Sequence, residues 1–502
     1  MEKQKSRGRR LLLVPCPFQG HINPMFQLGT ILHSKGFSIA IAHTLFNFPN
    51  PSDHPDFDFL PIADGISKEE STEDFITFIL SLNVNCRIPF QESLCGMIEN
   101  QDLLDEIPCI IYDSLMYFAG DVAHHLKLPN IILQTCCVTN LVLYKIYPRL
   151  QEEGYLPVKD FTFLPMYNEQ VSSQDVVELI KGFNINCKAP LQELLAPRAS
   201  KDSISLDLVP GFHPLRFRDL PIFNYKNSDA LLQVLADFCS LIRYPSAIIW
   251  NTIEFLEHSS LEKYQQRHQI PFFTLGPLNK FAPASSSSLL EEDISCISWL
   301  DKQRPNSVLY VSLGSLASMD KKQLNEMAWG LANSKQPFLW VIRPGSVSGS
   351  EWIELLPDGF VEVVCERGCI VKWAPQKVVL AHDAVGGFWS HCGWNSTVES
   401  ISEGVPMICW PYFLDQRVHA RYLSHVWRLG IAYENELESG EVKETVRRLM
   451  VSEEGQEMRQ RAMEFKEKVE LCIKPGGCSY NSLNELAKYI STLKKSPTDS
   501  IL

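Results

Sequence analysis

The sequence lacks any long hydrophobic run. Its first apolar stretch, Leu11–Val14, is stopped by Pro15, whereas the core of a secretory signal needs about 7–15 apolar residues. A later stretch, Ile131–Tyr144, is interrupted by Gln134 and by two further polar residues, so it falls short of the roughly 18 apolar residues of a membrane helix. We therefore expect a cytoplasmic protein that does not insert into membranes.

The sequence also lacks zinc-type cysteine spacing, an excess of basic charge and the glycine motif of dinucleotide-binding proteins. None of the 15 cysteines forms a CxxC pair, which argues against a zinc site or a disulfide framework. The 46 basic residues are outnumbered by 59 acidic ones, and the net charge of -13 disfavours nucleic acid as a partner. No two glycines are separated by a single residue, so the GxGxxG motif of nicotinamide-dependent oxidoreductases is absent.

Short apolar runs alternate with longer amphipathic stretches along the chain. Apolar runs without polar alternation, separated by helical patterns, are typical of parallel strands that are covered on both faces. The sequence therefore predicts an α/β protein with doubly wound parallel sheets. The predicted strands are Leu11–Pro15, Ser38–His43, Cys109–Asp113, Ile131–Leu133, Ala247–Trp250, Ser307–Ser312, Phe338–Ile342 and Gly387–Ser390, and the predicted helices include Met25–Lys35, Tyr117–Leu126 and Lys321–Ser334.

Two domains are expected, because 502 residues exceed the usual size of one core. Residues 279–289 contain Pro283 and four consecutive serines, a composition typical of linkers. We place an N-terminal domain at residues 1–278 and a second domain at residues 290–478. Ligands of doubly wound sheets bind beyond the carboxyl ends of the strands, so we expect the site in a cleft between the two domains.

An internal repeat lies within the first domain. Residues Thr72–Leu94 resemble Ser173–Leu195 at a fixed offset of 101 residues. Two copies do not make a solenoid, which needs at least about three. We interpret the second copy as part of a duplicated surface insert of about residues 161–203, with an error in assembling the coding sequence as the competing explanation.

Residues 373–416 form the most informative segment of the chain. Ala384–Ser390 has the pattern of a strand, residues 391–396 that of a polar turn, and Thr397–Glu403 that of a helix start. A helix start offers free backbone N–H groups and the positive end of the helix dipole, which suit a diphosphate. The turn adds side-chain hydrogen-bond donors and a glycine through which the backbone can approach a ligand: His391, Gly393, Asn395 and Ser396.

Other side chains of this segment suit a nucleoside and a sugar. Trp373 can stack on a nucleobase, and Glu399 can accept hydrogen bonds from ribose hydroxyls. Asp415 and Gln416 end a proline-containing loop and offer acceptors and donors for sugar hydroxyls. The segment therefore has the parts needed to hold a sugar nucleotide.

Residues 373–416 resemble the secondary-product glycosyltransferase box of plant family 1 UDP-glycosyltransferases in length and at nearly every informative position. Val311–Ser315 resembles the glycine–serine loop on the donor side of that family. The resemblance extends over most of the chain and is nearest to the group that contains steviol and cytokinin glucosyltransferases. It adds four residues to the expected donor site: Ser315, Ala374, Gln376 and Trp394.

The resemblance also implies the architecture. Members of this family have the GT-B fold, in which two doubly wound domains face each other across a cleft. Residues 476–480 resemble the turn before the last helix of the family. Residues 479–502 are therefore expected to form a helix that returns to the N-terminal domain.

A second motif, residues 17–24, resembles the family's N-terminal motif and places its catalytic histidine at His21. Asp113 follows a predicted strand, where the family has the aspartate that orients this histidine. The resemblance implies an inverting reaction with His21 as general base. The chemistry fits, because a histidine with its usual pKa of about 6.5 can accept a proton from an acceptor hydroxyl at neutral pH.

The resemblance implies UDP-glucose as the donor, since Trp394 and Gln416 accompany glucose donors in the family. Two positions depart from common usage, Gly387 and Arg417. Arg417 directly follows the expected sugar contacts, so another UDP-sugar stays open. We expect the acceptor to be a hydroxyl, carboxyl or amine of a small lipophilic plant metabolite such as a flavonoid, terpenoid or hormone.

Neither a metal ion nor a cofactor is expected, since helix N–H groups and His391 can stabilise the leaving UDP and UDP-glucose is a co-substrate. The sequence Asp56-Phe57-Asp58 matches the DxD pattern of metal-dependent transferases. Strand alternation, however, places both aspartates on the solvated face. A non-catalytic sugar-nucleotide-binding protein is the alternative function, and the presence of His21 and Asp113 argues against it. We expect a monomer.

Overall fold

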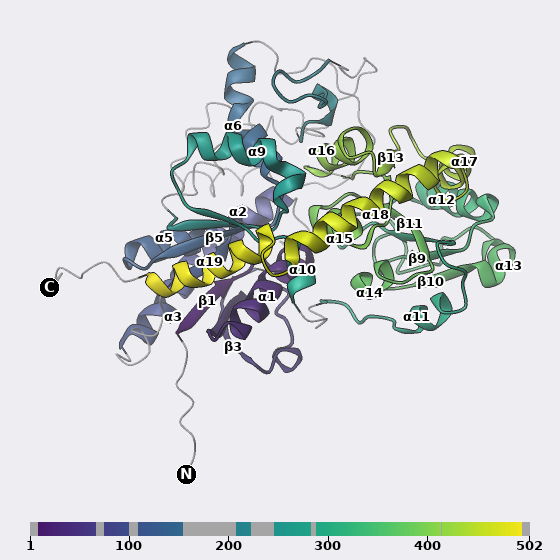
Figure 1. The fold of residues 1–502 in the computed structure, drawn as a ribbon. Coiled ribbons are helices and arrows are strands. Elements are labelled where there is room, and N and C mark those ends of the chain that lie inside the picture. Colours follow the sequence, from purple (N-terminus) through teal and green to yellow (C-terminus); the bar gives the residue numbers. More distant parts are fainter. Residues whose placement is uncertain are drawn as a thin grey trace.

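The computed structural model describes residues 9–66, 75–99, 109–153, 207–221, 245–282, 288–412 and 414–493. These residues form two parallel sheets with helices on both faces (Figure 1). The first sheet has the strand order β3-β2-β1-β4-β5-β6-β7, and the second has the order β10-β9-β8-β11-β12-β13. All strand pairs in both sheets are parallel. The two doubly wound sheets that the sequence predicts are thereby confirmed.

The first sheet and its neighbouring segments come from the first part of the chain. In chain order they are β1 (Arg10–Val14), α1 (Gln19–Ser34), β2 (Ser38–Thr44), η1 (Pro51–Asp53), β3 (Phe57–Ile62), α2 (Phe75–Asn85), α3 (Arg87–Glu99), β4 (Ile110–Asp113), α5 (Tyr117–His125), β5 (Asn130–Gln134), α6 (Val138–Glu152), η4 (Phe217–Asp219), β6 (Ala247–Trp250), α9 (Glu254–Arg267), β7 (Phe272–Thr274) and α10 (Leu278–Phe281).

The second sheet follows, and two helices close the described chain. In order they are α11 (Ser295–Leu300), β8 (Val308–Ser312), α12 (Lys321–Ser334), β9 (Phe338–Val341), α13 (Phe360–Val364), η5 (Cys365–Arg367), β10 (Gly368–Val371), α14 (Gln376–Leu380), β11 (Val385–Ser390), α15 (Trp394–Glu403), β12 (Met407–Cys409), α16 (Gln416–Arg421), η6 (Tyr422–Val426), β13 (Gly430–Ala432), α17 (Ser439–Met450), α18 (Glu453–Ile473) and α19 (Cys478–Thr492).

Most predicted elements have bounds within one or two residues of the observed ones, and β6 and α12 match their predicted bounds. The start of α1 was predicted wrongly, since the helix begins at Gln19 rather than Met25. Pro24 lies inside α1. A proline inside a helix lacks the N–H for an i→i−4 hydrogen bond, which is why the pattern favoured a later start. His21 consequently lies in the first turn of α1.

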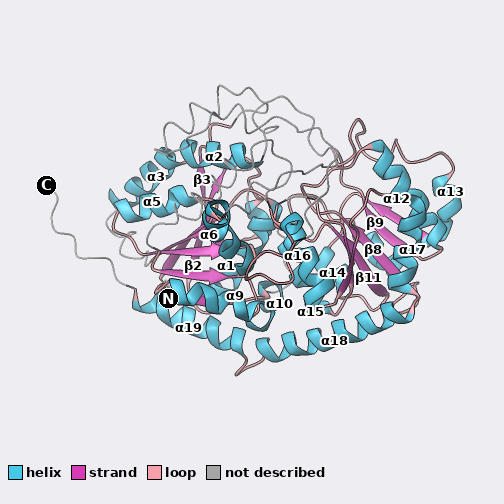
Figure 2. Ribbon diagram, turned by 90° about the horizontal axis from the view of Figure 1, so that it is seen from above, coloured by secondary structure: helices cyan, strands magenta, loops and turns pink. Residues whose placement is uncertain are grey.

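The last two helices connect the two sheets. Figures 1 and 2 show α18 along the second sheet and α19 along the first. Leu483, Leu486 and Ile490 of α19 share a core with Leu11 and Leu13 of β1. The C-terminal helix is therefore part of the packing of the first sheet. The predicted domain limits themselves stay predictions.

Some sequence expectations concern the periphery of the molecule. Asp56 and Asp58 are exposed, and Asp58 of β3 pairs with Arg10 of β1, across the intervening strand β2. The DxD pattern therefore lies on the solvated face as expected. The duplicated insert, residues 161–203, lies outside the described residues, as do residues 283–287 of the predicted linker. No helix within the described ranges is both long and apolar enough to cross a bilayer.

Candidate active site

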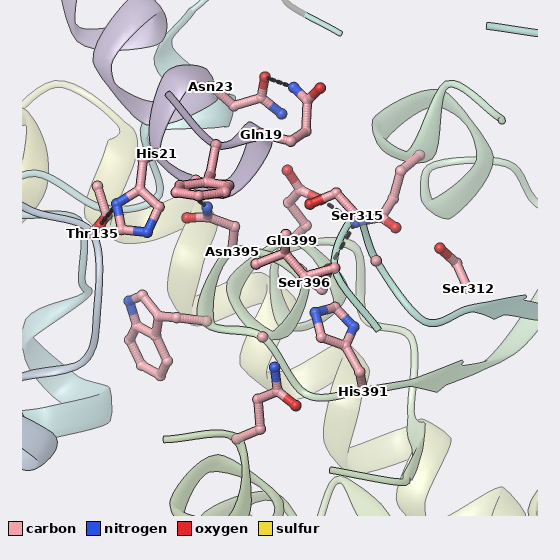
Figure 3. A pocket seen from close by; sticks show the side chains of 18 of the residues that line it. Gln19, His21, Asn23, Thr135, Ser312, Ser315, His391, Asn395, Ser396 and Glu399 are labelled. Atoms are coloured by element: carbon pink, nitrogen blue, oxygen red, sulfur yellow. Dashed lines mark hydrogen bonds between the residues drawn. The ribbon is translucent and has the colours of Figure 1, made fainter. Parts of the chain in front are cut away.

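A cavity of about 350 Å³ lies between the carboxyl ends of the two sheets. Figure 3 shows side chains from both sides of this cavity, with His21 and Thr135 across from His391 and Ser315. Every residue that the sequence assigns to the donor site lines it, together with His21. Those donor-site residues are Ser315, Trp373, Ala374, Gln376, His391, Gly393, Trp394, Asn395, Ser396, Glu399, Asp415 and Gln416.

The sheet topology explains why these residues meet. In each sheet the strand order changes direction at one point. This point lies between β1 and β4 in the first sheet and between β8 and β11 in the second. Chains that leave the carboxyl ends of such a pair diverge, which leaves a crevice for a ligand. His21 follows β1 and Asp113 ends β4, whereas Ser315 follows β8 and His391 follows β11. The cavity therefore joins two switch points.

His21 and Asp113 are in direct contact. The Nδ1 atom of His21 lies 2.8 Å from Oδ2 of Asp113 and 2.9 Å from the hydroxyl of Thr135. Asp113 is fully buried, and its other oxygen accepts a hydrogen bond from the backbone N–H of Leu115 at 3.0 Å. Because a carboxylate only accepts, Nδ1 carries the proton and Nε2 is the ring nitrogen with a free lone pair.

Burial and charge act in opposite directions on His21. Burial lowers the pKa of His21, while the charge of Asp113 and its hydrogen bond raise it, and Asp415 adds a smaller effect of the same sign. The net result is a raised pKa. Asp113 therefore both orients the imidazole and stabilises its protonated form. The sequence did not single out Thr135, although a polar residue directly after β5, beside β4, was a usable signal.

Cys16 lies beside this pair. Among the described residues, one group of potential metal ligands has its ligand atoms within 4.8 Å of one another: Cys16, His21 and Asp113. Burial, followed by the charge of Asp113, raises the pKa of the Cys16 thiol well above its usual value. A protonated thiol is a poor metal ligand, because the thiolate is the binding form. These residues fit a base and its orienting partners better than a metal site.

His391 forms part of the opposite wall. Burial, with a smaller effect from the nearby His419, lowers the pKa of His391 to about 4, so the imidazole is neutral at neutral pH. Within the described part of the chain its buried Nδ1 atom has no hydrogen-bond partner. A Cβ atom added at Gly314 or at Gly393 would lie 2.5 Å from the ring. Both glycines therefore make room for this side chain, a role that the sequence did not assign to them.

Gln376 connects two other donor-site residues. Its Nε2 atom donates to Oε2 of Glu399 at 2.7 Å and to the hydroxyl oxygen of Ser396 at 3.0 Å, while its Oε1 accepts from Tyr310 at 3.3 Å. Burial raises the pKa of Glu399, against the opposing effects of Gln376 and Lys377. This network fixes the orientation of Glu399 near the middle of α15.

The start of α15 differs from the predicted one. The helix begins at Trp394 rather than at Thr397, with Gly393 just before it. The indole of Trp394 donates to the backbone carbonyl of Asn251 at 2.8 Å, and the amide of Asn395 donates to the backbone carbonyl of Gly20. Two side chains expected to serve the donor alone thus bond to elements of the first sheet.

In the sequence Arg417 directly follows the expected sugar contacts, but the structure does not place it on the cavity. It is absent from the residues that line the cavity, because α16 begins at Gln416 and each helical residue is rotated by about 100° from the one before. Burial lowers the pKa of Arg417 to about 10, and Asp219 opposes this effect. The side chain of Arg417 is therefore not among those that line the expected donor site.

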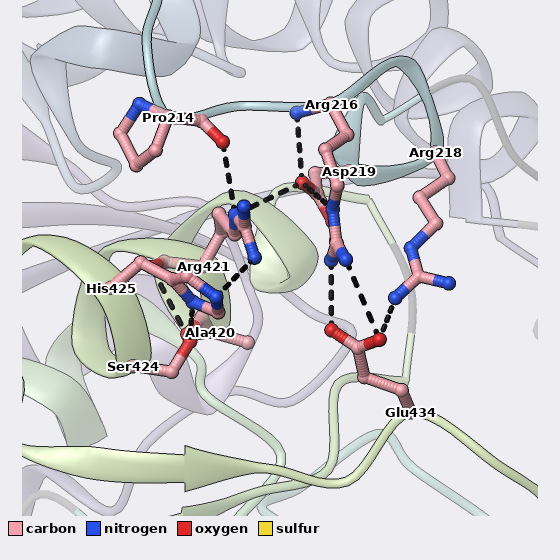
Figure 4. Close-up of polar contacts among 9 residues, drawn as sticks. All are labelled: Pro214, Arg216, Arg218, Asp219, Ala420, Arg421, Ser424, His425 and Glu434. Atoms are coloured by element: carbon pink, nitrogen blue, oxygen red, sulfur yellow. Dashed lines mark hydrogen bonds and ion pairs between the residues drawn. The ribbon is translucent and has the colours of Figure 1, made fainter. Parts of the chain in front are cut away.

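A charged cluster surrounds Asp219 (Figure 4). Arg216 bonds to Asp219 at 2.7 Å and to Glu434 at 2.8 Å, and Arg218 also pairs with Glu434. Arg421 of α16 lies 3.6 Å from Asp219 and donates to the carbonyl of Pro214 at 2.9 Å. The cluster attaches the segment around η4 to α16 and to the residues after β13, and none of its charged residues lines the cavity.

Comparisons with known proteins identify the family of the chain. A family model described as UDP-glucoronosyl and UDP-glucosyl transferase matches residues 291–465. UDP-glycosyltransferase 76E1 of Solanum lycopersicum is 45% identical over 492 residues, covering 97% of this chain and 93% of that protein. Flavonol 3-O-glucosyltransferase UGT76E12 of Arabidopsis thaliana is 44% identical over 497 residues, covering 98% and 99%.

The solved structures give the same result. Phytolacca americana UGT2, complexed with UDP-2fluoro-glucose and pterostilbene, is 25% identical and aligns with a TM-score of 0.75 over 97% of this chain and 100% of that one. Two doubly wound domains with a site at their shared cleft define a GT-B glycosyltransferase. The chain belongs to the plant UDP-glycosyltransferases, so the predicted family, fold and enzyme class are confirmed.

Proposed function

We propose that this UDP-glycosyltransferase is an inverting enzyme that transfers glucose from UDP-glucose to a small lipophilic plant metabolite. The observation that carries this proposal is the placement of His21, which contacts Asp113, and of the start of α15 on the same cavity. A base that faces a diphosphate-binding helix start can serve a single-displacement reaction. The relatives' names and the UDP-sugar bound to the Phytolacca enzyme support the choice of donor and acceptor class.

The proposed reaction has one displacement step. The Nε2 atom of His21 takes the proton of the acceptor hydroxyl as the acceptor oxygen forms a bond to C1 of glucose. The bond between C1 and the β-phosphate oxygen breaks, and its electron pair leaves with UDP. Asp113 stabilises the imidazolium that results, which the raised pKa of His21 reflects. Attack opposite the leaving group inverts the anomeric centre.

We further propose that no metal ion takes part. Negative charge that develops on UDP would be stabilised by the N–H groups at the start of α15 and by the imidazole of His391, both of which line the cavity. Fixed donors in a water-poor site act strongly on such charge. Monomeric state and a cytoplasmic location belong to the same proposal.

The acceptor side of the cavity supports a lipophilic partner. Its described walls include six aromatic or aliphatic side chains near His21, which suit an apolar molecule that presents one reactive group. These side chains are those of Phe18, Phe75, Ile79, Leu115, Leu141 and Tyr144.

One assay tests the proposal. The purified protein is incubated with UDP-glucose, EDTA and a panel of flavonols, terpenoid acids and plant hormones, and the products are searched by mass spectrometry for a gain of one hexose. A gained hexose supports a metal-independent glucosyltransferase. Transfer only with another UDP-sugar, or only without EDTA, contradicts the donor or the metal part of the proposal.

A further inference from the structure

A directional chain of hydrogen bonds joins the two sheets at the edge of the cavity. Asn251 follows β6, and its Oδ1 accepts from the backbone N–H of Leu278 at 3.3 Å. Its Nδ2 donates to Oδ1 of Asn395 at 3.1 Å, and Nδ2 of Asn395 donates to the carbonyl of Gly20. The chain begins at a group that only donates and ends at a group that only accepts, so both amide orientations are fixed.

The sequence of α1 explains why the carbonyl of Gly20 is available. In a regular helix this carbonyl would accept from the N–H of the residue four positions later. That residue is Pro24, which has no N–H. The missing donor leaves the carbonyl one residue before His21 open to a partner from the second sheet, and Asn395 takes that place.

Asn251 also holds the neighbouring residue of α15. Its backbone carbonyl accepts the indole N–H of Trp394 at 2.8 Å. The first two residues of the donor helix are therefore both bonded to Asn251, which is itself only 4% exposed. Its backbone N–H bonds to the carbonyl of Gln134 at the end of β5 at 3.1 Å. The residue is thus fixed in the first sheet.

We propose that Asn251 is a positioning residue for glycosyl transfer, which acts through Asn395 to set the distance between His21 and the start of α15. The inference rests on the proposed function, because it concerns the alignment of the same base and donor. Alignment of this kind matters, since a displacement of about 1 Å between reacting groups can cost roughly 10²-fold in rate. Asn395 then serves alignment in addition to any contact with the donor.

The variant Asn251→Asp tests the inference most sharply. A carboxylate still accepts from the N–H of Leu278, so the local fold keeps its hydrogen bond, but it cannot donate to Asn395. The amide of Asn395 must then turn, which places its oxygen against the carbonyl of Gly20. We expect kcat to fall about 10–100-fold while the Kd for UDP stays within about twofold.

A matched control is Ser479→Ala. Ser479 is also fully buried and donates to the carbonyl of Gly276 at 2.7 Å, close to Leu278, but it is not part of the chain to Gly20. This variant should lose a buried hydrogen bond without the loss of kcat. Pro24→Ala, which restores a competing N–H for the carbonyl of Gly20, should lower kcat by a smaller factor than Asn251→Asp.

Hydrogen exchange provides a readout that needs no turnover. Exchange in peptides that cover residues 16–26 should increase in Asn251→Asp and in Asn395→Ala but not in Ser479→Ala. Unchanged exchange in the first two, or an unchanged kcat in Asn251→Asp, would overturn the inference. If the wild-type protein transfers no sugar to any acceptor, the proposed function fails, and the exchange data still decide whether the bridge exists.

Discussion

His21 and His391 face the same cavity from opposite sheets, and their surroundings move their pKa values in opposite directions. Both follow the carboxyl end of a parallel strand. His21 contacts a fully buried carboxylate, which raises its pKa against the effect of burial. His391 has no such partner, and burial lowers its pKa to about 4. Burial lowers the pKa of both imidazoles, so the carboxylate of Asp113 accounts for the difference between them. It makes His21 suited to act as a base, whereas His391 stays a neutral hydrogen-bond donor.

The largest expected effect comes from His21→Ala. Transfer should fall about 10²–10⁴-fold, because the acceptor hydroxyl loses its base, while the Kd for UDP measured by calorimetry should change little. Weakened UDP binding with only slightly reduced kcat would show that His21 serves the donor rather than the acceptor. In that case the two histidines would not differ in role.

Asp113→Asn should lower kcat by about 10²-fold, since the imidazole loses its orientation. Its effect on the pH profile is more specific. The base works only when neutral, so wild-type activity falls as the pH drops through the raised pKa of His21. Removing the carboxylate lowers that pKa, and the acidic limb of the kcat/KM profile should move to lower pH. A limb that stays in place would mean that another group titrates.

His391→Ala should weaken UDP-glucose binding about tenfold, the size of one hydrogen bond to a charged group. The acidic limb of the pH profile should not move, because His391 is already neutral there with its pKa of about 4. This variant is the direct counterpart of Asp113→Asn. If it shifted the limb as well, the division between base and donor would be wrong.

The smallest expected effect comes from Gly314→Ala. Gly314 has φ of 77°, and its added Cβ would lie 2.5 Å from the ring of His391. Gly345 has a similar φ of 72° but no atom within 4 Å of such a Cβ, so Gly345→Ala is the matched control. Both changes should cost about 1–2 kcal/mol of unfolding free energy for the left-handed backbone, measured by chemical denaturation. Only Gly314→Ala should also weaken UDP-glucose binding.

Local patterns in the sequence were sufficient to predict the two sheets and most of the residues that line the cavity. The strands around β1, β4, β8 and β11 are apolar runs followed by polar turns, and parallel topology then brings His21, Asp113 and His391 to shared edges. The strands β7, β10, β12 and β13 were not predicted; three of them have only three residues, which carry little periodicity.

Such local patterns could not predict the contacts between the two halves of the molecule. The bonds from Asn395 to Gly20 and Asn251 join residues 375 and 144 positions apart. They depend on how the domains dock, which no local period encodes. The position of Arg417 was misjudged for a related reason, since adjacency in sequence does not determine which side chains at the start of α16 line the cavity.

The placement of α19 has a consequence for how the protein is made. The core beneath β1 is completed by Leu483, Leu486 and Ile490, which leave the ribosome only after the whole second sheet. During synthesis the part of this core that α19 covers stays exposed, although α1 already packs in the same core through Ile22 and Met25 and domains usually fold in the order of their synthesis. A nascent chain of this kind is a natural client for chaperones, and the first sheet expressed without α19 should aggregate.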